Sequence, residues 1–172
     1  MKKIKLFDPF TNESEKNAIK QIFDSHFWAS GEGVGKVQKF EEKFSKYTSS
    51  KSCVAVNSGT AALNLALSMY NIKNKEVIIP SLSFVSTANA VIENGGIPKF
   101  VDIDEKTLCM DPEKVLKAIS KKTKIILPVH FGGLTSNLMK ISKLCKEHKI
   151  SLVEDAAHAA GSLHQNKKIG SH

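Results

Sequence analysis

The sequence contains no arginine, because all 25 of its basic residues are lysines. Arginine is the side chain best suited to paired hydrogen bonds with phosphates and base edges, so its absence disfavours a nucleic-acid-binding protein. The lysines are scattered apart from short clusters such as 121–124, and we interpret them as solvated surface. The formal net charge of +8 still favours the approach of anionic small molecules.

Cysteine and long apolar runs are also scarce. The three cysteines lie far apart and in no metal-ligand spacing, which predicts reduced thiols, no metal site and a cytoplasmic protein. No apolar run approaches the roughly 20 residues that cross a bilayer, so no membrane association is expected. Acidic residues rather than an apolar segment follow the basic residues 1–5, which argues against a secretory signal.

The length of 172 residues fits one domain or part of a larger one. Residues 1–50 are expected to form a helical segment. Asn12 and Glu15 have the spacing of a helix cap, and a second helix is predicted over 34–47. A glycine-rich loop, 28–33, lies between the two helices.

Short apolar segments alternate with amphipathic ones over residues 51–172. The pattern predicts strands at 53–56, 76–79, 99–101, 124–127 and 151–153, and helices at 60–70, 84–93, 112–119 and 136–148. This alternation is typical of an α/β fold, a mostly parallel sheet flanked by helices. In such sheets ligands bind beyond the carboxyl ends of the strands, so the residues that follow each strand are candidate site residues.

Ser58, Gly59 and Thr60 follow the first predicted strand and open a helix. A helix start offers unpaired N–H groups and a positive dipole end, which favour a phosphate. Ordinary helix capping by Ser58 or Thr60 is the alternative. The Walker A pattern is absent from the sequence.

Asp155 follows the last predicted strand, and His158 comes three residues later. The carboxylate suits a cationic ring nitrogen or a metal, although capping of a following helix is an equal alternative. Further metal ligands are not placed nearby, so no metal site is predicted. Phe84 is either a stacking surface for a planar ligand or a core residue, and His130 is either a site residue or a buried, hydrogen-bonded histidine.

Four segments occur in one order: SGTAALNLAL, PSLSFVSTANAVIENGGIPKFVDID, ILPVHFGG and VEDAAHAAGS. Together they resemble the N-terminal part of the DegT/DnrJ/EryC/StrS family. These are pyridoxal 5'-phosphate (PLP) enzymes that aminate keto-sugars attached to nucleotides. The resemblance runs from WASGEGVGKVQKFEEKF to the last residue.

The resemblance implies a fold-type I PLP-dependent transferase, with this chain as the N-terminal part of the large domain. The rest of that domain and a small C-terminal domain would be absent. Ser58, Gly59 and Thr60 would hold the PLP phosphate, and Phe84 would stack on the pyridine ring. We also expect the loop at 28–33 to lie near the sugar nucleotide.

Two residues would serve the chemistry itself. By the resemblance, Asp155 would pair with the ring nitrogen and His158 would lie near the ring hydroxyl. Two further residues, Gly31 and His130, are candidates for contact with the substrate.

The Schiff-base lysine of the family is the main departure, because in relatives it lies downstream of the Asp155 motif. Lys167 and Lys168 lie in a polar turn that resembles the family's connecting hairpin, and neither is assigned as that lysine. We therefore expect a fragment that is inactive on its own.

The resemblance implies an aminotransferase that acts on a nucleotide-linked keto-sugar, with an amino donor such as glutamate, and a homodimer at full length. A PLP-dependent keto-deoxysugar dehydratase of the same family, in which histidine replaces the lysine, is one alternative. A non-catalytic α/β binding or regulatory module is the other. Amino-sugar products would serve lipopolysaccharide, capsule, glycan or antibiotic biosynthesis.

Overall fold

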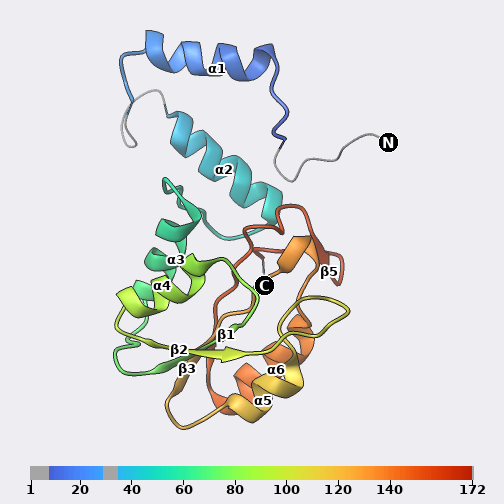
Figure 1. Ribbon diagram of the computed structural model, residues 1–172. Coiled ribbons are helices and arrows are strands. Elements are labelled where there is room, and N and C mark those ends of the chain that lie inside the picture. The colour runs from blue at the N-terminus through green and yellow to red at the C-terminus, as the bar shows by residue number, and fades with distance from the viewer. Residues whose placement is uncertain (1–7, 29–34, 172) are drawn as a thin grey trace.

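The computed structural model describes residues 8–28 and 35–171. Two helices come first, α1 (Glu13–Asp24) and α2 (Lys36–Thr48). α1 begins at Asn12, whose Oδ1 accepts a hydrogen bond from Ser14 N–H and whose own N–H donates to Glu15 Oε2, as the cap spacing predicts. α1 lies at the end of the molecule farthest from the sheet, and α2 connects it to the rest (Figure 1). The candidate residue Gly31 lies outside the described residues.

A four-stranded parallel sheet forms the centre of the remaining chain. The strands run in the spatial order β2-β1-β3-β4, and their bounds are β1 (Glu76–Pro80), β2 (Ile97–Val101), β3 (Thr123–Ile126) and β4 (Ser151–Leu152). The chain leaves β1 toward β2 on one side and leaves β3 toward β4 on the other. The neighbouring strands β1 and β3 therefore form the switch point, where α/β sheets bind their ligands.

Helices cover both faces of the sheet (Figure 1). One face carries α3 (Gly59–Ser68) and α4 (Val85–Glu93), and the other carries α5 (Pro112–Ala118) and α6 (Leu138–His148). Side chains of a strand alternate between the two faces. Val77 and Ile79 of β1 accordingly pack under α3 and α4, whereas Ile78 packs under α5 and α6. This double burial explains why the strands read as continuous apolar runs.

The predicted strand at 53–56 is wrong, because these residues form no strand. Val54 and Val56 are exposed, and Ala55 N–H donates to the Glu41 carboxylate (2.7 Å) instead of to a neighbouring strand. An apolar sequence favours an extended backbone, but a strand also needs a hydrogen-bonding partner. The other predicted elements form with ends that differ by a few residues.

A two-stranded hairpin, β5 (Leu163–His164) and β6 (Lys167–Lys168), follows the sheet. Its turn residues Gln165 and Asn166 both have positive φ, as a two-residue hairpin turn requires. A 3-10 turn, η1 (Phe131–Gly133), follows β3. Within residues 8–28 and 35–171, every helix is too short or too polar to cross a bilayer.

Candidate functional site

A cavity of about 520 Å³ opens at the carboxyl edge of the sheet, beside the β1/β3 switch point. It lies within the size range of small-molecule sites. Residues that follow β1, β3 and β4 line it together with the start of α3. The lining residues are Gly59, Thr60, Leu63, Ser83, Phe84, Ser86, Phe131, Asp155, Ala157 and His158. Five predicted site residues, far apart in the sequence, therefore meet in one place.

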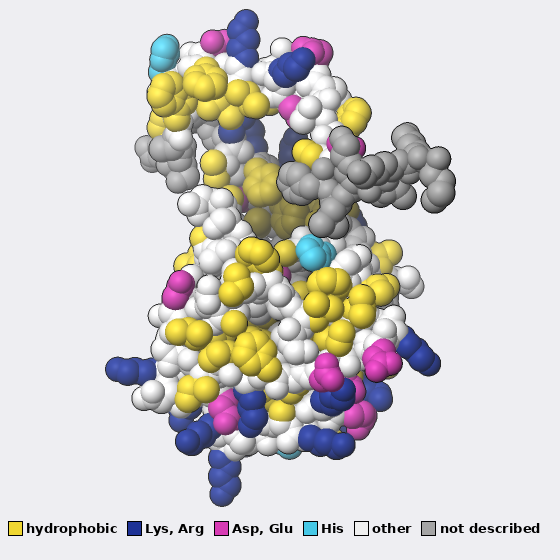
Figure 2. Space-filling model, in the orientation of Figure 1, with side chains coloured by type: hydrophobic (Ala, Val, Ile, Leu, Met, Phe, Trp, Pro, Cys, Tyr) yellow, Lys and Arg dark blue, Asp and Glu magenta, His cyan; other side chains and the backbone are white. Residues whose placement is uncertain are grey.

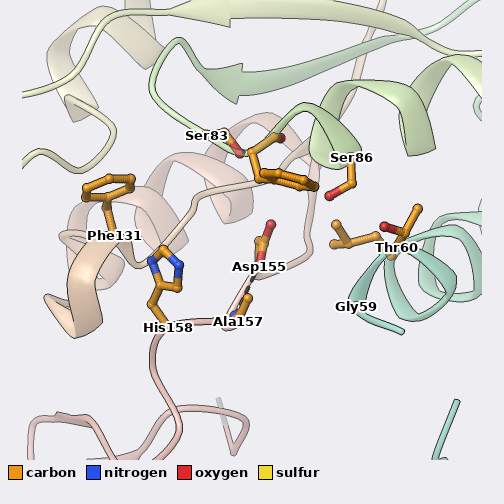
Figure 3. Close-up of a pocket in the computed structure, with 10 residues that line it drawn as sticks. Gly59, Thr60, Ser83, Ser86, Phe131, Asp155, Ala157 and His158 are labelled. Carbon is orange, nitrogen blue, oxygen red and sulfur yellow. Dashed lines mark hydrogen bonds between the residues drawn. The ribbon is translucent and has the colours of Figure 1, made fainter. Parts of the chain in front are cut away.

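The start of α3 forms one end of this cavity (Figure 3). Ser58 is the N-cap, and its Oγ accepts a hydrogen bond from Ala61 N–H (3.2 Å), so the predicted capping role is confirmed. Gly59 and Thr60 then face the cavity. A Cβ at Gly59 would have no atom within 4 Å, so the space beside this backbone is open. First-turn N–H groups together with the Thr60 hydroxyl can bind a phosphate here.

Asp155 lies between the two ends of the cavity in Figure 3 and is 8% exposed. Its Oδ2 accepts from Thr87 Oγ1 (2.9 Å), and its Oδ1 accepts from Ala157 N–H (3.2 Å). The backbone is held as well, because Asp155 N–H donates to Pro128 O (2.9 Å) and His130 N–H donates to Asp155 O (3.1 Å). The residues that follow form turns rather than a helix, so Asp155 caps no helix.

His158 and Phe131 form the other end of the cavity (Figure 3). Their rings meet edge to face, with centroids 5.6 Å apart. Gly132 N–H donates to His158 Nδ1 (3.2 Å), which leaves Nε2 to carry the ring hydrogen. Gly132 has φ of 61°, a conformation that glycine adopts without strain. The loop after β3 thus fixes His158 as a hydrogen-bond donor.

Phe84 is the N-cap residue of α4, and the residue is 74% exposed although it lines the cavity. A core phenylalanine would be buried. The structure therefore favours the stacking role over the core role. An exposed ring at a cavity wall offers a flat apolar surface to a planar ligand.

His130 does not line the cavity, because its side chain is fully buried. Its Nε2 lies 2.8 Å from Glu154 Oε2, and its Nδ1 accepts from Ser136 N–H (3.1 Å). Of the two roles that the sequence left open, the position supports the buried, hydrogen-bonded one. The ring braces the ends of β3 and β4 beside Asp155.

Sequence reasoning assigned no role to six residues of this region: Leu63, Ser83, Ser86, Thr87, Phe131 and Ala157. Thr87 follows Phe84 by three residues, so the helical spacing places both in the first turn of α4. Phe131 belongs to the quoted ILPVHFGG segment. Within residues 8–28 and 35–171, no cluster of three or more histidine, cysteine or acidic side chains could hold a metal.

Known proteins resemble this chain over nearly its whole length. The model of the DegT/DnrJ/EryC1/StrS aminotransferase family matches residues 9–172. The spore coat polysaccharide biosynthesis protein SpsC of Bacillus subtilis is 40% identical over 164 residues, which are 95% of this chain and 41% of that protein. GDP-perosamine synthase of Vibrio cholerae is 33% identical over 168 residues, which are 97% of this chain and 45% of that protein.

A solved structure shares the fold. The crystal structure of GDP-4-keto-6-deoxymannose-3-dehydratase with a trapped PLP-glutamate geminal diamine is 31% identical, with a TM-score of 0.90. The match covers 98% of this chain and 45% of that one. The chain thus spans less than half the length of these relatives.

Proposed function

The chain belongs to the DegT/DnrJ/EryC1/StrS aminotransferase family, and from this premise we propose that it is the N-terminal part of a PLP-dependent aminotransferase acting on a nucleotide-linked keto-sugar. It has the α/β fold of the fold-type I PLP enzymes. The names of a perosamine synthase and a keto-deoxysugar dehydratase among its relatives support a sugar nucleotide as substrate. The glutamate adduct in the dehydratase structure supports glutamate as amino donor.

One observation carries the proposal: the cavity has a helix start suited to a phosphate at one end, an exposed aromatic ring along its wall and a buried carboxylate in between. These features suit the three distinct parts of PLP, its phosphate, its ring and its ring nitrogen. The Gly59 backbone and the Thr60 hydroxyl would bind the phosphate, while Phe84 would stack on the ring. PLP, when bound, acts as an electron sink for the bonds broken at the substrate carbon.

Asp155 would accept a hydrogen bond from the protonated ring nitrogen. Two hydrogen-bond donors from the protein hold its carboxylate, one on each oxygen. A charge-assisted bond of this kind is about twice as strong as a neutral one. Asp155 thereby keeps the proton on the ring nitrogen.

His158 would donate its Nε2 hydrogen to the ring hydroxyl oxygen. Gly132 N–H occupies Nδ1, so the ring presents the donor and not an acceptor on its other side. Phe131 packs against the imidazole and limits its rotation.

Lys167 and Lys168 remain unassigned as the Schiff-base residue. Both lie in β6, outside the cavity, and Lys168 Nζ lies 3.3 Å from the centre of the Tyr47 ring. We propose that the lysine lies beyond His172 and that residues 1–172 alone do not transaminate. The codons after His172 decide the chemistry, because lysine there supports the aminotransferase and histidine supports the dehydratase. Absence of both would support a non-catalytic module.

We further propose that the full-length enzyme is a cytoplasmic homodimer. Three free cysteines, two of them buried, fit a reducing compartment. Size-exclusion chromatography of the full-length protein with light scattering tests the dimer.

Pyridoxamine 5'-phosphate (PMP) tests the site without needing the lysine, because it binds without a covalent bond. A fluorescence titration of residues 1–172 should show binding. Asp155→Ala should weaken binding by about ten- to a hundredfold, and Thr60→Ala by less, because the backbone N–H groups remain. Asp102→Ala removes an exposed aspartate paired with Lys114 and should leave binding unchanged. Native affinity in a folded Asp155→Ala variant would contradict the proposal.

A further inference from the structure

Two hydrogen bonds connect three side-chain oxygen atoms, those of Ser83, Thr87 and Asp155, beside the cavity. Ser83 Oγ lies 2.6 Å from Thr87 Oγ1, and Thr87 Oγ1 lies 2.9 Å from Asp155 Oδ2. Thr87 is fully buried, whereas Ser83 lines the cavity. Thr87 and Asp155 are 68 residues apart in the sequence and belong to the segments that follow β1 and β4. The two hydrogen bonds thus join the segment that carries Phe84 to the carboxylate.

The directions of these hydrogen bonds follow from the number of hydrogens. An ionised carboxylate only accepts, so the single hydroxyl hydrogen of Thr87 points at Asp155 Oδ2. Ser83 must then donate to Thr87 Oγ1. The carbonyl oxygen of Phe84 also lies 3.2 Å from Ser83 Oγ, a longer contact than the 2.6 Å to Thr87. The result is a directed relay from Ser83 through Thr87 to Asp155.

The relay constrains the carboxylate in a way that one donor could not. Thr87 holds Oδ2 and Ala157 N–H holds Oδ1, so rotation of the carboxylate plane breaks at least one bond. Hydrogen bonds to an ionised carboxylate also stabilise its charge, and a hydroxyl that itself accepts a bond is a stronger donor. The first turn of α4, where Thr87 lies, adds the favourable end of the helix dipole.

We propose that Thr87 is a positioning residue for the cofactor ring nitrogen and that Ser83 polarises it, so that the Ser83–Thr87 relay holds the Asp155 carboxylate aimed into the cavity. This inference rests on the proposed function. Thr87 itself does not line the cavity and acts only through Asp155.

PMP labelled with ¹⁵N in its ring, bound to residues 1–172, reports the proton on that nitrogen directly. Thr87→Val keeps the shape of the side chain and removes the hydroxyl. Its nitrogen signal should shift toward the unprotonated form, and PMP affinity should fall by about three- to tenfold, the size of one hydrogen bond. Thr87→Ser should restore the native signal. Ser83→Ala should shift the signal in the same direction by less.

Thr48→Val is the matched control, because Thr48 is a buried threonine that bonds to Phe44 O and lies away from the cavity. It should leave the nitrogen signal and the affinity native. A native nitrogen signal in both Thr87→Val and Ser83→Ala would overturn the relay. Loss of PMP binding in Asp155→Ala would in that case still support the proposed function. If Thr87→Val does not fold, Ser83→Ala decides alone. If native PMP binding is insensitive to Asp155→Ala, the proposed function and the relay both fail.

Discussion

The two N-terminal helices and the α/β body differ sharply in how they use their apolar residues. α1 buries no residue and α2 buries only Thr48, whereas the central strands β1 and β3 pack between helices on both faces. Phe23 of α1 remains 62% exposed, and hydrophobic side chains are visible along α1 at the top of Figure 2. Ile126 in β3 is fully buried.

This difference in burial reflects two origins of secondary structure, local sequence signals and contacts between distant segments. α1 forms from local signals, a capping box at Asn12 and apolar residues at helical spacing. The body forms from contacts between segments far apart in the sequence. Local signals alone give marginal helices, because most helical stability in proteins comes from packing. The proposed cofactor site belongs to the body, where backbone hydrogen bonds to Pro128 and His130 hold Asp155.

The largest effect should come from removing volume in the body. Ile126→Ala in the fully buried core should lower the free energy of unfolding by about 2–5 kcal/mol. Ile19→Ala, the matched change on the exposed face of α1, should change it by less than about 0.5 kcal/mol. Urea denaturation measures both. Equal losses would show that α1 is packed and that the comparison is wrong.

Adding a methyl group tests how tightly the body is packed. A Cβ at Gly96 would lie 2.9 Å from Val91 Cγ1 and 3.0 Å from Ile72 Cδ1. Gly96→Ala should therefore destabilise the protein by about 1–3 kcal/mol. Gly59→Ala meets open space and should leave stability unchanged, although its methyl group would enter the proposed phosphate site. In thermal melts only Gly96→Ala should lower the melting temperature. In PMP titrations only Gly59→Ala should weaken binding.

A polar cluster at the start of β1 gives the body a pH dependence. A hydrogen bond from the Ser120 hydroxyl, aided by Lys99 and Thr123, lowers the pKa of Glu76 below its ordinary 4.5, although burial works against the shift. Because the folded-state pKa is lowered, this stabilisation is present above 4.5 and is lost as the pH falls through the lower folded value.

Glu76→Gln should thus cost about 1–2 kcal/mol at neutral pH, with the difference from the native protein vanishing in acid. Glu13→Gln breaks an exposed pair with Lys16 on α1 and should cost almost nothing at any pH. Urea titrations across the acid range test both variants. A Glu76→Gln deficit that persisted at low pH would assign the loss to packing rather than to charge.

The smallest global effect should come from the cap of α1. Asn12→Ala removes the capping bonds and should cost about 1 kcal/mol of local helix stability. The global unfolding transition should not move, because α1 buries no residue against the body. Hydrogen exchange should therefore speed up in α1 alone, and faster exchange in the sheet would contradict this separation.

Sequence reasoning predicted what local patterns determine. The helices and the strands under them follow from periodicity, and the hairpin follows from the family resemblance, although Lys167 and Lys168 lie in β6 and not in its turn. The strand predicted at 53–56 is wrong, because no local pattern shows whether an extended segment will pair with a neighbouring strand. For the same reason Thr87 was missed: its bond to Asp155 depends on how the segments after β1 and β4 meet.

The same limit applies to the candidate site, because local sequence patterns identify its residues but do not determine their burial. Gly59, Thr60, Phe84, Asp155 and His158 were identified because each follows a strand or matches a family segment. The alternatives left open for Phe84 and His130 depended on burial, which their neighbours in sequence do not determine. The structure gives the two residues opposite exposures: Phe84 is exposed at the cavity wall, which favours the stacking role, and His130 is fully buried.

A crystal structure of residues 1–172 in complex with PMP would show whether the cavity binds the cofactor. We expect the phosphate at the start of α3, the ring against Phe84 and the ring nitrogen within about 2.7–3.2 Å of an Asp155 carboxylate oxygen. PMP bound outside this cavity, or bound within it with the ring nitrogen turned away from Asp155, would show that the proposed cofactor site is wrong.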